Sequence, residues 1–365
     1  MLELKNVSKR VGNQVHLSDV SMRLEAGSLN VLLGPTLSGK TSLMRIMAGL
    51  DKPTTGSVFF DGSDVTGVEV QKRDVAMVYQ TFINYPALSV YENIASPMKI
   101  ARRPSQEIKD TVGRVAELLR LTPYLDRLPL QLSGGQQQRT ALARALAKNA
   151  KLVLMDEPLA NLDYKLREEL RAELPKIFEG TGAIFVYATA EPEEALLLGG
   201  NTATLEEGRV TQFGPTVSVY RTPNTLSTAR TFSDPPLNFG AVLKTGSQFV
   251  PQPTGGDAAM DAIPVPQKYL HLPDGKYSIA IRPHHLSLHP VVTGNVTLSG
   301  SVVATEITGS ETYIHMAIYE RWIMLTHGVH TFAPGHRVEF HFDRDKLMVF
   351  AEDERAVEAP SVLAA

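Results

Sequence analysis

The sequence predicts an α/β domain followed by an all-β domain. Strand and helix patterns alternate through the first half of the chain, and short alternating strands fill its last third. In the first half, a glycine-rich turn joins an apolar strand directly to a helix. With 365 residues, 43% of them hydrophobic, the chain is long enough for two domains with separate cores.

In the first half, apolar runs that end in glycine or polar residues predict strands, and apolar residues at helical spacing predict helices. Two of the runs, residues 151–158 and 183–189, are apolar on both faces, as is typical of central parallel strands. The predicted strands are residues 28–34, 57–62, 74–80, 151–158 and 183–189, and the predicted helices are residues 40–50, 104–121 and 135–150.

The composition changes near residues 213–215. Between Val219 and Leu272 the chain is rich in Pro, Gly, Thr and Ser, which favours turns. Short alternating segments follow, and several short strands bounded by turns predict a small barrel or sandwich. These segments are residues 277–283, 298–309, 311–319, 321–327, 337–342 and 346–351.

Composition excludes several classes of protein. The net charge is −3 and no basic run exceeds Arg102-Arg103, so we expect no nucleic-acid partner. The absence of cysteine excludes disulfides and thiol chemistry. The first residues form no signal peptide, and no apolar run approaches about 18 residues, so we expect a soluble cytoplasmic protein.

The segment "GPTLSGKT", Gly34 to Thr41, fits the pattern G-x-x-x-x-G-K-[ST] between a predicted strand and a predicted helix. Gly34 and Gly39 let the backbone wrap tightly and direct N–H groups at phosphate oxygens. The helix that follows adds its positive end. Lys40 can reach the β and γ phosphates, and the Thr41 hydroxyl can ligate Mg²⁺.

The run "LVLMDEP" places two carboxylates after a predicted strand. Asp156 would hold Mg²⁺, directly or through water. Glu157 would act as the general base that polarises the attacking water. Together with the upstream phosphate-binding turn, this pair predicts a site for a magnesium nucleotide.

The segment "LSGGQ", Leu132 to Gln136, begins an alanine-rich helix. Ser133 can cap that helix, and Gly134 and Gly135 leave bare N–H groups at its positive end. This is a second phosphate receiver, and one nucleotide does not need two. We therefore expect Ser133, Gly134, Gly135 and Gln136 to contact the nucleotide of a partner subunit.

The order of these three motifs resembles the ATPase subunit of an ABC transporter, in its sugar and polyol importer branch. The segments "AMVYQTFINYPALSVYENI" and "DEPLANLDYKLR" are similar to that branch, as are "FGPTVSVYRTPNTLSTARTFSDPPLNF" and "IAIRPHHLSL" near the second domain. The resemblance implies a P-loop NTPase with a RecA-like core and a helical subdomain, followed by an all-β OB-type barrel. It places the nucleotide-binding domain at residues 1–215, its helical subdomain at about 86–150, a linker at 216–240 and the regulatory barrel at 241–365.

The resemblance also implies the site residues. It adds Gln80 to Thr41 and Asp156 near Mg²⁺ and assigns Asp163 to the D-loop. ATP would be bound by Gly34, Pro35, Thr36, Leu37, Ser38, Gly39, Lys40, Thr41 and Ser42. The implied partners are a second ATPase subunit, two membrane-spanning permease subunits and, indirectly, a periplasmic or extracellular substrate-binding protein. The implied location is the cytoplasmic face of the bacterial inner membrane, as a peripheral protein.

Three positions depart from the family pattern. The family's switch histidine corresponds to Ala190 in "TAE", so the imidazole at the γ-phosphate is missing. An aromatic residue that stacks on adenine corresponds to Val11, and the usual D-loop serine corresponds to Ala160. Losing one transition-state stabiliser costs on the order of 10²–10³ in rate, so we expect slow hydrolysis in this chain's own site.

Several interpretations follow. The favoured one is the ATPase of a bacterial importer for a sugar or polyol, paired with a different ATPase subunit in a heterodimer. In a homodimer, Glu157 alone would suffice, or Glu191 would replace the histidine. The alternatives are a non-hydrolysing structural or regulatory subunit and an ABC protein of DNA repair or ribosome function.

Overall fold

The computed structural model describes residues 1–365 except 82, 161, 179–180, 253–260, 320 and 358–365. The chain divides into two compact units, Met1–Arg221 and Thr222–Ala365, which are described separately. Residues 216–240, expected as a linker, contain helices α7 (Thr216–Arg221) and α8 (Leu226–Thr231). The end of the expected barrel, residues 358–365, lies outside the described part.

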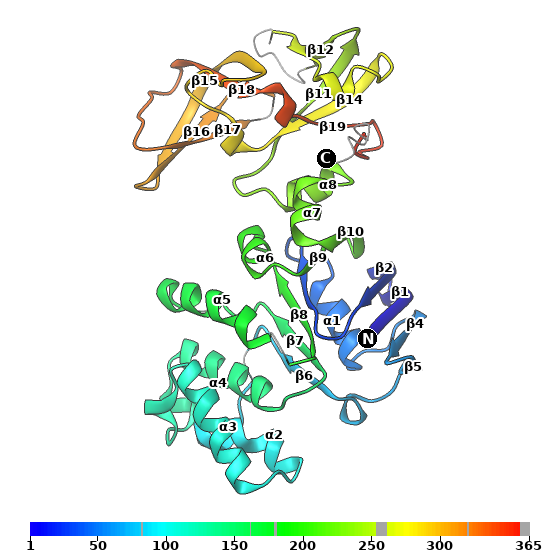
Figure 1. The fold of residues 1–365 in the computed structure, drawn as a ribbon, viewed down its shortest axis with the longest axis vertical. Coiled ribbons are helices and arrows are strands. Elements are labelled where there is room, and N and C mark those ends of the chain that lie inside the picture. The colour runs from blue at the N-terminus through cyan, green and yellow to red at the C-terminus, as the bar shows by residue number, and fades with distance from the viewer. Residues whose placement is uncertain (82, 161, 179–180, 253–260, 320, 358–365) are drawn as a thin grey trace. The chain divides into compact units, whose positions relative to one another are not determined.

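The first unit contains a six-stranded sheet in the order β10-β9-β3-β8-β7-β6 (Figure 1). Every neighbouring pair is parallel except β9 and β10. All residues of β7 and β8 are buried, as their unbroken apolar runs predict. The strands are β3 (Leu29–Leu33), β6 (Val75–Val78), β7 (Leu152–Asp156), β8 (Ile184–Thr189), β9 (Asn201–Glu206) and β10 (Arg209–Pro215).

A second, antiparallel sheet in the order β2-β1-β4-β5 packs in the same unit. Helix α1 (Lys40–Ala48) shares one hydrophobic core with both sheets through side chains such as Leu43 and Met47. This packing holds the start of α1 next to the carboxyl end of the parallel strand that ends at Asp156. The strands of this sheet are β1 (Leu2–Val11), β2 (Gln14–Leu24), β4 (Thr55–Phe60) and β5 (Ser63–Asp64).

Helices α2, α3 and α4 pack against one another, apart from α1 (Figure 1). Capping boxes begin two of them: Ser89 with Glu92 in α2, and Ser133 with Gln136 in α4. The remaining helices of the unit are α2 (Val90–Ile100), α3 (Ser105–Leu118), α4 (Gly134–Ala147), α5 (Tyr164–Phe178) and α6 (Pro192–Leu198), with 3-10 turns η1 (Val70–Lys72), η2 (Thr122–Tyr124) and η3 (Pro129–Gln131).

The second unit contains two antiparallel sheets, in the orders β13-β12-β11-β14-β19 and β17-β16-β15-β18. Alternate side chains of β11, β15 and β16 are buried, and the unit has a core around Trp322 and Phe340. Its elements are β11 (Asn238–Thr245), β12 (Gln248–Pro251), β13 (Ile263–Pro264), η4 (Gln267–Tyr269), β14 (Gly275–Ile281), η5 (Pro283–His285), β15 (Asn295–Ile307), β16 (Glu311–Met316), β17 (Trp322–His327), β18 (Arg337–Asp343), η6 (Arg344–Lys346) and β19 (Met348–Phe350).

Within the part of the chain that the structure describes, no helix combines the length and apolar character needed to cross a bilayer.

Candidate nucleotide-binding site

The turn from Gly34 to Gly39 joins β3 to α1 and leaves no room for side chains at its two glycines. A Cβ on Gly34 would lie 2.4 Å from the Leu205 carbonyl oxygen. Gly39 has a φ of 104°, which disfavours any other residue. Glycine is therefore required at both positions, at Gly34 for lack of space and at Gly39 by its backbone conformation.

Lys40 follows this turn as the first residue of α1, and its side chain bends back over the turn. Its Nζ donates to the Gly34 carbonyl at 2.7 Å and to the Pro35 carbonyl at 3.0 Å. The same atom lies 3.9 Å from Glu157 Oε1. Burial lowers the pKa of Lys40, although Glu157 and Asp156 oppose that shift. An anion bound in the turn would offer Lys40 a stronger acceptor than these carbonyls.

Two features of the turn fit phosphate. Ser38 is buried, and its Oγ has no hydrogen-bond partner. The first turn of α1, residues 40–42, presents backbone N–H groups that have no acceptors within the helix. The turn therefore has hydrogen-bond donors, the Ser38 hydroxyl and the N–H groups at the start of α1, that could bind a phosphate.

The carboxyl ends of β6 and β7 bring the predicted magnesium and water ligands together. Asp156 ends β7, is buried, and accepts a 2.7 Å hydrogen bond from the Thr41 hydroxyl. Burial raises the pKa of Asp156, while Thr41 and Lys40 counteract this shift. Gln80 Nε2 donates to Glu157 Oε2 at 2.8 Å. These hydroxyl, carboxylate and amide oxygens form the donor set that Mg²⁺ prefers.

The carboxyl end of β8 lies directly beside the phosphate turn. The Gly34 N–H donates to the Thr189 carbonyl at 3.3 Å, and Leu33 pairs with Thr189 across the two strands. Ala190 follows and is exposed. This position therefore offers only a methyl group next to the start of the turn.

The next residue, Glu191, is held by side chains of α5. Its carboxylate forms ion pairs with Arg167, at 3.1 Å, and with Arg171, both on α5. Arg171 is buried and also pairs with Glu194 at 2.9 Å and with Glu168 at 2.7 Å. These contacts hold the Glu191 carboxylate against α5.

The sequence analysis did not identify this ion-pair network. Burial lowers the pKa of Arg171, but hydrogen bonding and attraction from Glu194, Glu191 and Glu168 outweigh it and raise the pKa overall. Tyr187 of β8 donates to Glu194 at 3.1 Å. The spacing of Glu168 and Arg171, three residues apart on α5, is a sequence signal for part of this network.

The second phosphate receiver lies on a different part of the unit. Ser133 caps α4 by accepting from the Gln136 N–H at 3.3 Å, and Ser133 and Gly134 are exposed. Figure 1 shows α4 grouped with α2 and α3 and separate from α1. The structure thus assembles the predicted residues into two groups: the turn with Gln80, Asp156, Glu157 and Ala190, and the segment Ser133–Gln136.

The other predicted positions lie around the first group. Ala160 is exposed, and its N–H donates to the Glu157 carbonyl at 3.3 Å. The Asp163 carbonyl accepts from the Arg167 N–H at 2.9 Å as α5 begins. Val11 ends β1, pairs with Gln14 across a tight hairpin and is 54% exposed.

The backbone conformation of Leu37 is a feature that the sequence analysis did not predict. It has a φ of 69° and is 96% exposed, at the apex of the phosphate turn. A left-handed backbone at a leucine is strained, and such strain concentrates at functional sites. The sequence pattern allows any residue here, so only the backbone conformation reveals the strain.

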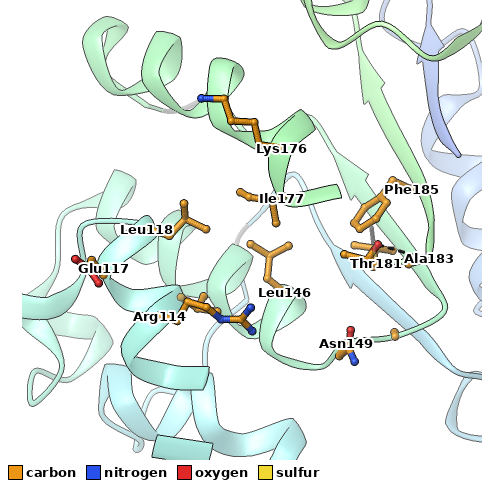
Figure 2. Close-up of a pocket in the computed structure, with 13 residues that line it drawn as sticks. Arg114, Glu117, Leu118, Leu146, Asn149, Lys176, Ile177, Thr181, Ala183 and Phe185 are labelled. Carbon is orange, nitrogen blue, oxygen red and sulfur yellow. Dashed lines mark hydrogen bonds between the residues drawn. The ribbon is translucent and has the colours of Figure 1, made fainter. Parts of the chain in front are cut away.

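A cavity of 680 Å³ lies away from these groups, beside the amino end of β8 (Figure 2). Leu118 of α3, Leu146 of α4 and Ile177 of α5 point into it, with Phe185 at its wall. Because nucleotides bind at the carboxyl ends of parallel strands, this cavity is not part of the nucleotide site.

The phosphate turn, the strand-end carboxylates and the parallel sheet define a P-loop nucleotide-binding protein. Comparison with known families identifies the class more closely. A family model described as "ABC transporter" matches residues 17–160, and one described as "TOBE domain" matches residues 279–350.

Curated relatives match nearly the whole chain. The alpha-glucoside transport ATP-binding protein AglK of Rhizobium meliloti is 34% identical over 96% of this chain and 97% of its own length. The Fe(3+) ions import ATP-binding protein FbpC of Photobacterium profundum is 34% identical over 84% of this chain and 87% of its own. An uncharacterized ABC transporter ATP-binding protein, YcjV of Escherichia coli, is 32% identical over 98% of this chain and 99% of its own length.

Among solved structures, the ATP-binding cassette MJ0796 in a dimeric post-hydrolysis state with ADP and Pi matches with a TM-score of 0.55 and 30% identity. The match covers 59% of this chain and 99% of the cassette. The chain therefore belongs to the ATP-binding proteins of ABC transporters. It is an ABC-type ATPase that uses ATP and Mg²⁺, and the predicted fold class, a P-loop domain followed by an OB-type barrel, is confirmed.

Proposed function

We propose that this chain is the ATP-binding subunit of a bacterial importer for a sugar or polyol. Two of the three relatives are named for a cargo, which is alpha-glucoside for one and Fe(3+) ions for the other. At equal identity, the match to the alpha-glucoside protein extends over more of both chains, which favours an organic cargo. The chain would act at the cytoplasmic face of the inner membrane, with two permease subunits and a substrate-binding protein.

In the proposed site, residues 34–42 bind the phosphates of ATP and Lys40 contacts the β and γ phosphates. Thr41, Asp156 and Gln80 hold Mg²⁺, which when bound neutralises phosphate charge. Glu157 takes a proton from the attacking water. Its hydrogen bond from Gln80 orients the carboxylate toward Lys40.

We infer that this site hydrolyses ATP slowly. The observation that carries this inference is the end of β8: Ala190 has no polar side chain, and the carboxylate of Glu191 is paired with Arg167 and Arg171. Ala190 has no group that could replace an imidazole, and Glu191 could replace it only by breaking those ion pairs. The lost stabilisation corresponds to a factor of about 10²–10³ in rate.

Ser133 and Gly134 are exposed, and the segment Ser133–Gln136 keeps a complete helix cap, so this chain can still complete the site of a partner. We therefore propose a heterodimer with one slow site on this chain's phosphate turn, and one fast site on the partner's turn against this chain's Ser133. Asp163 would lie at the same interface.

The test measures phosphate release by the purified full chain, alone and mixed with a candidate second ATPase. We expect slow release alone and fast release in the mixture, lost when the partner's general base is removed. Fast release by this chain alone would contradict the slow site and the heterodimer. Binding of ATP without any single-turnover hydrolysis would instead indicate a non-hydrolysing regulatory subunit.

The cargo is tested separately by uptake in cells with and without the gene. We expect loss of uptake of a labelled glucoside, another sugar or glycerol. Loss of Fe(3+) uptake with unchanged sugar and polyol uptake would contradict the proposed cargo class while leaving the importer role intact.

A further inference from the structure

The cavity beside the amino end of β8 lies between two groups of elements of the first unit (Figure 2). Helices α3 and α4 form one side, and α5 with the strands β7 and β8 forms the other. Its volume of 680 Å³ is within the range of about 300–1,000 Å³ that is typical of small-molecule sites. The cavity is therefore large enough for one small organic molecule.

Most of the wall of this cavity is apolar. Leu118 of α3, Leu146 of α4 and Ile177 of α5 point into the cavity and are only half-buried, so part of their apolar surface is uncovered. Val153 of β7 and Phe185 of β8 also line the cavity and are buried. Protein interiors leave few voids larger than a water molecule, so aliphatic side chains that converge without filling the space between them indicate a binding pocket. The body of a ligand here would be apolar.

Arg114 of α3 adds a positive charge to this apolar wall. Its side chain is exposed and extends toward Leu146 and Asn149 (Figure 2). Among the described residues, no acidic side chain forms an ion pair with Arg114. By contrast, Arg120, two residues after α3, pairs with Glu169 at 2.7 Å. The Arg114 guanidinium is thus an available donor for an anionic group.

The other charged side chains of the wall are directed elsewhere. Lys176 pairs with Glu173 of the same helix at 2.9 Å. Glu117 points away from the Arg114 guanidinium (Figure 2). A single guanidinium binds a carboxylate through two parallel hydrogen bonds. A phosphate group carries more charge and would need further donors, which the apolar side chains of this wall do not offer.

We propose that this cavity binds a small organic carboxylate, with the carboxylate on Arg114 and an apolar body against the aliphatic side chains of α3, α4 and α5. The site is separate from the proposed ATP site, which lies at the carboxyl ends of the strands. The ligand would contact α4, which follows Ser133, and β7, which ends at Asp156. The inference is independent of the proposed cargo and of the rate of hydrolysis.

The test measures binding of phenylacetate, 3-phenylpropionate and octanoate to the full chain by calorimetry. At least one of these acids should bind saturably. The corresponding primary amide, which is uncharged, should bind about 10- to 150-fold more weakly, the range for hydrogen bonds to a charged group. Saturating Mg-ATP should leave binding of the acid unchanged, because the nucleotide site lies elsewhere.

Three variants locate the bound acid. Arg114→Gln should lower the affinity for the acid to that for the amide and leave amide binding unchanged. Arg120→Gln, with the same charge change outside the cavity, is the matched control and should bind the acid as the wild type does. Leu118→Trp places a larger side chain in the cavity and should remove binding of both compounds. Thermal unfolding of each variant verifies that it is folded.

Several results would overturn the proposal. Absence of saturable binding for all three acids would show that the cavity is not a site for this class of ligand. Equal affinities for acid and amide, or equal losses in the two arginine variants, would exclude recognition of the carboxylate by Arg114. Full binding in Leu118→Trp would place the acid outside the cavity, and competition by Mg-ATP would place it in the nucleotide site.

Discussion

The ends of β7 and β8 are neighbours in one sheet, yet they differ in the chemistry that they present. The end of β7 presents Asp156, hydrogen-bonded to Thr41, and Glu157, hydrogen-bonded to Gln80 and near Lys40. The end of β8 presents Ala190, and its next carboxylate, Glu191, is paired with arginines of α5. A carboxylate beside a phosphate site is therefore functional only if its neighbours leave it free to face the substrate.

The largest effect is expected at the end of β7. Glu157→Gln removes the general base and should lower single-turnover hydrolysis by about 10²–10⁴-fold without weakening ATP binding. Phosphate release and ATP titration measure the two effects. Glu191→Gln is the matched control, with the same charge change at the end of β8, and should leave the rate nearly unchanged. Equal losses in the two variants would show that Glu191 replaces the missing imidazole.

The next effect concerns stability. Arg171→Met leaves the buried Glu194 without its cation and should lower the free energy of unfolding by about 3–5 kcal/mol. Urea unfolding measures this change. Arg167→Met, at a more exposed ion pair with Glu191, should cost no more than about 1 kcal/mol. Similar losses for the two arginines would contradict the importance of burial in this network.

A histidine at position 190 tests whether the side chain at the end of β8 limits the hydrolysis rate. Ala190 is exposed and adjoins Gly34 through the Thr189 carbonyl, so a histidine can be accommodated there. Ala190→His should raise the hydrolysis rate of this chain's site by up to about 10²–10³-fold, as measured in the dimer with its partner. The gain should disappear in combination with Glu157→Gln. No gain in the otherwise wild-type chain would contradict the slow-site proposal.

The smallest effect is expected at position 11. Val11→Tyr adds a ring beside the nucleoside and should tighten ATP binding by about 1–3 kcal/mol. Calorimetry with Mg-ATP measures this change, and Val15→Ala on the other face of the hairpin should have no effect. An unchanged affinity would place the nucleoside away from the hairpin.

The helices and strands with strong periodicity were predicted closely. The run at residues 183–189 became β8 (Ile184–Thr189), and the helix predicted at residues 135–150 became α4 (Gly134–Ala147). Their apolar spacing alone specifies which faces are buried. The hairpin of β1 and β2 went unrecognised, because its bulges break the alternation on which strand prediction depends.

Sequence alone determined the fold class and predicted the phosphate turn, because glycine geometry, a lysine at fixed spacing and a strand-end carboxylate are local features. Only the tertiary structure decided which carboxylates remain available. The pairing of Glu191 with Arg171, the hydrogen bond of Thr41 to Asp156 and that of Gln80 to Glu157 each join elements that are separate in the chain. Side-chain availability is a property of packing, and packing brings together residues whose separation carries no local signal.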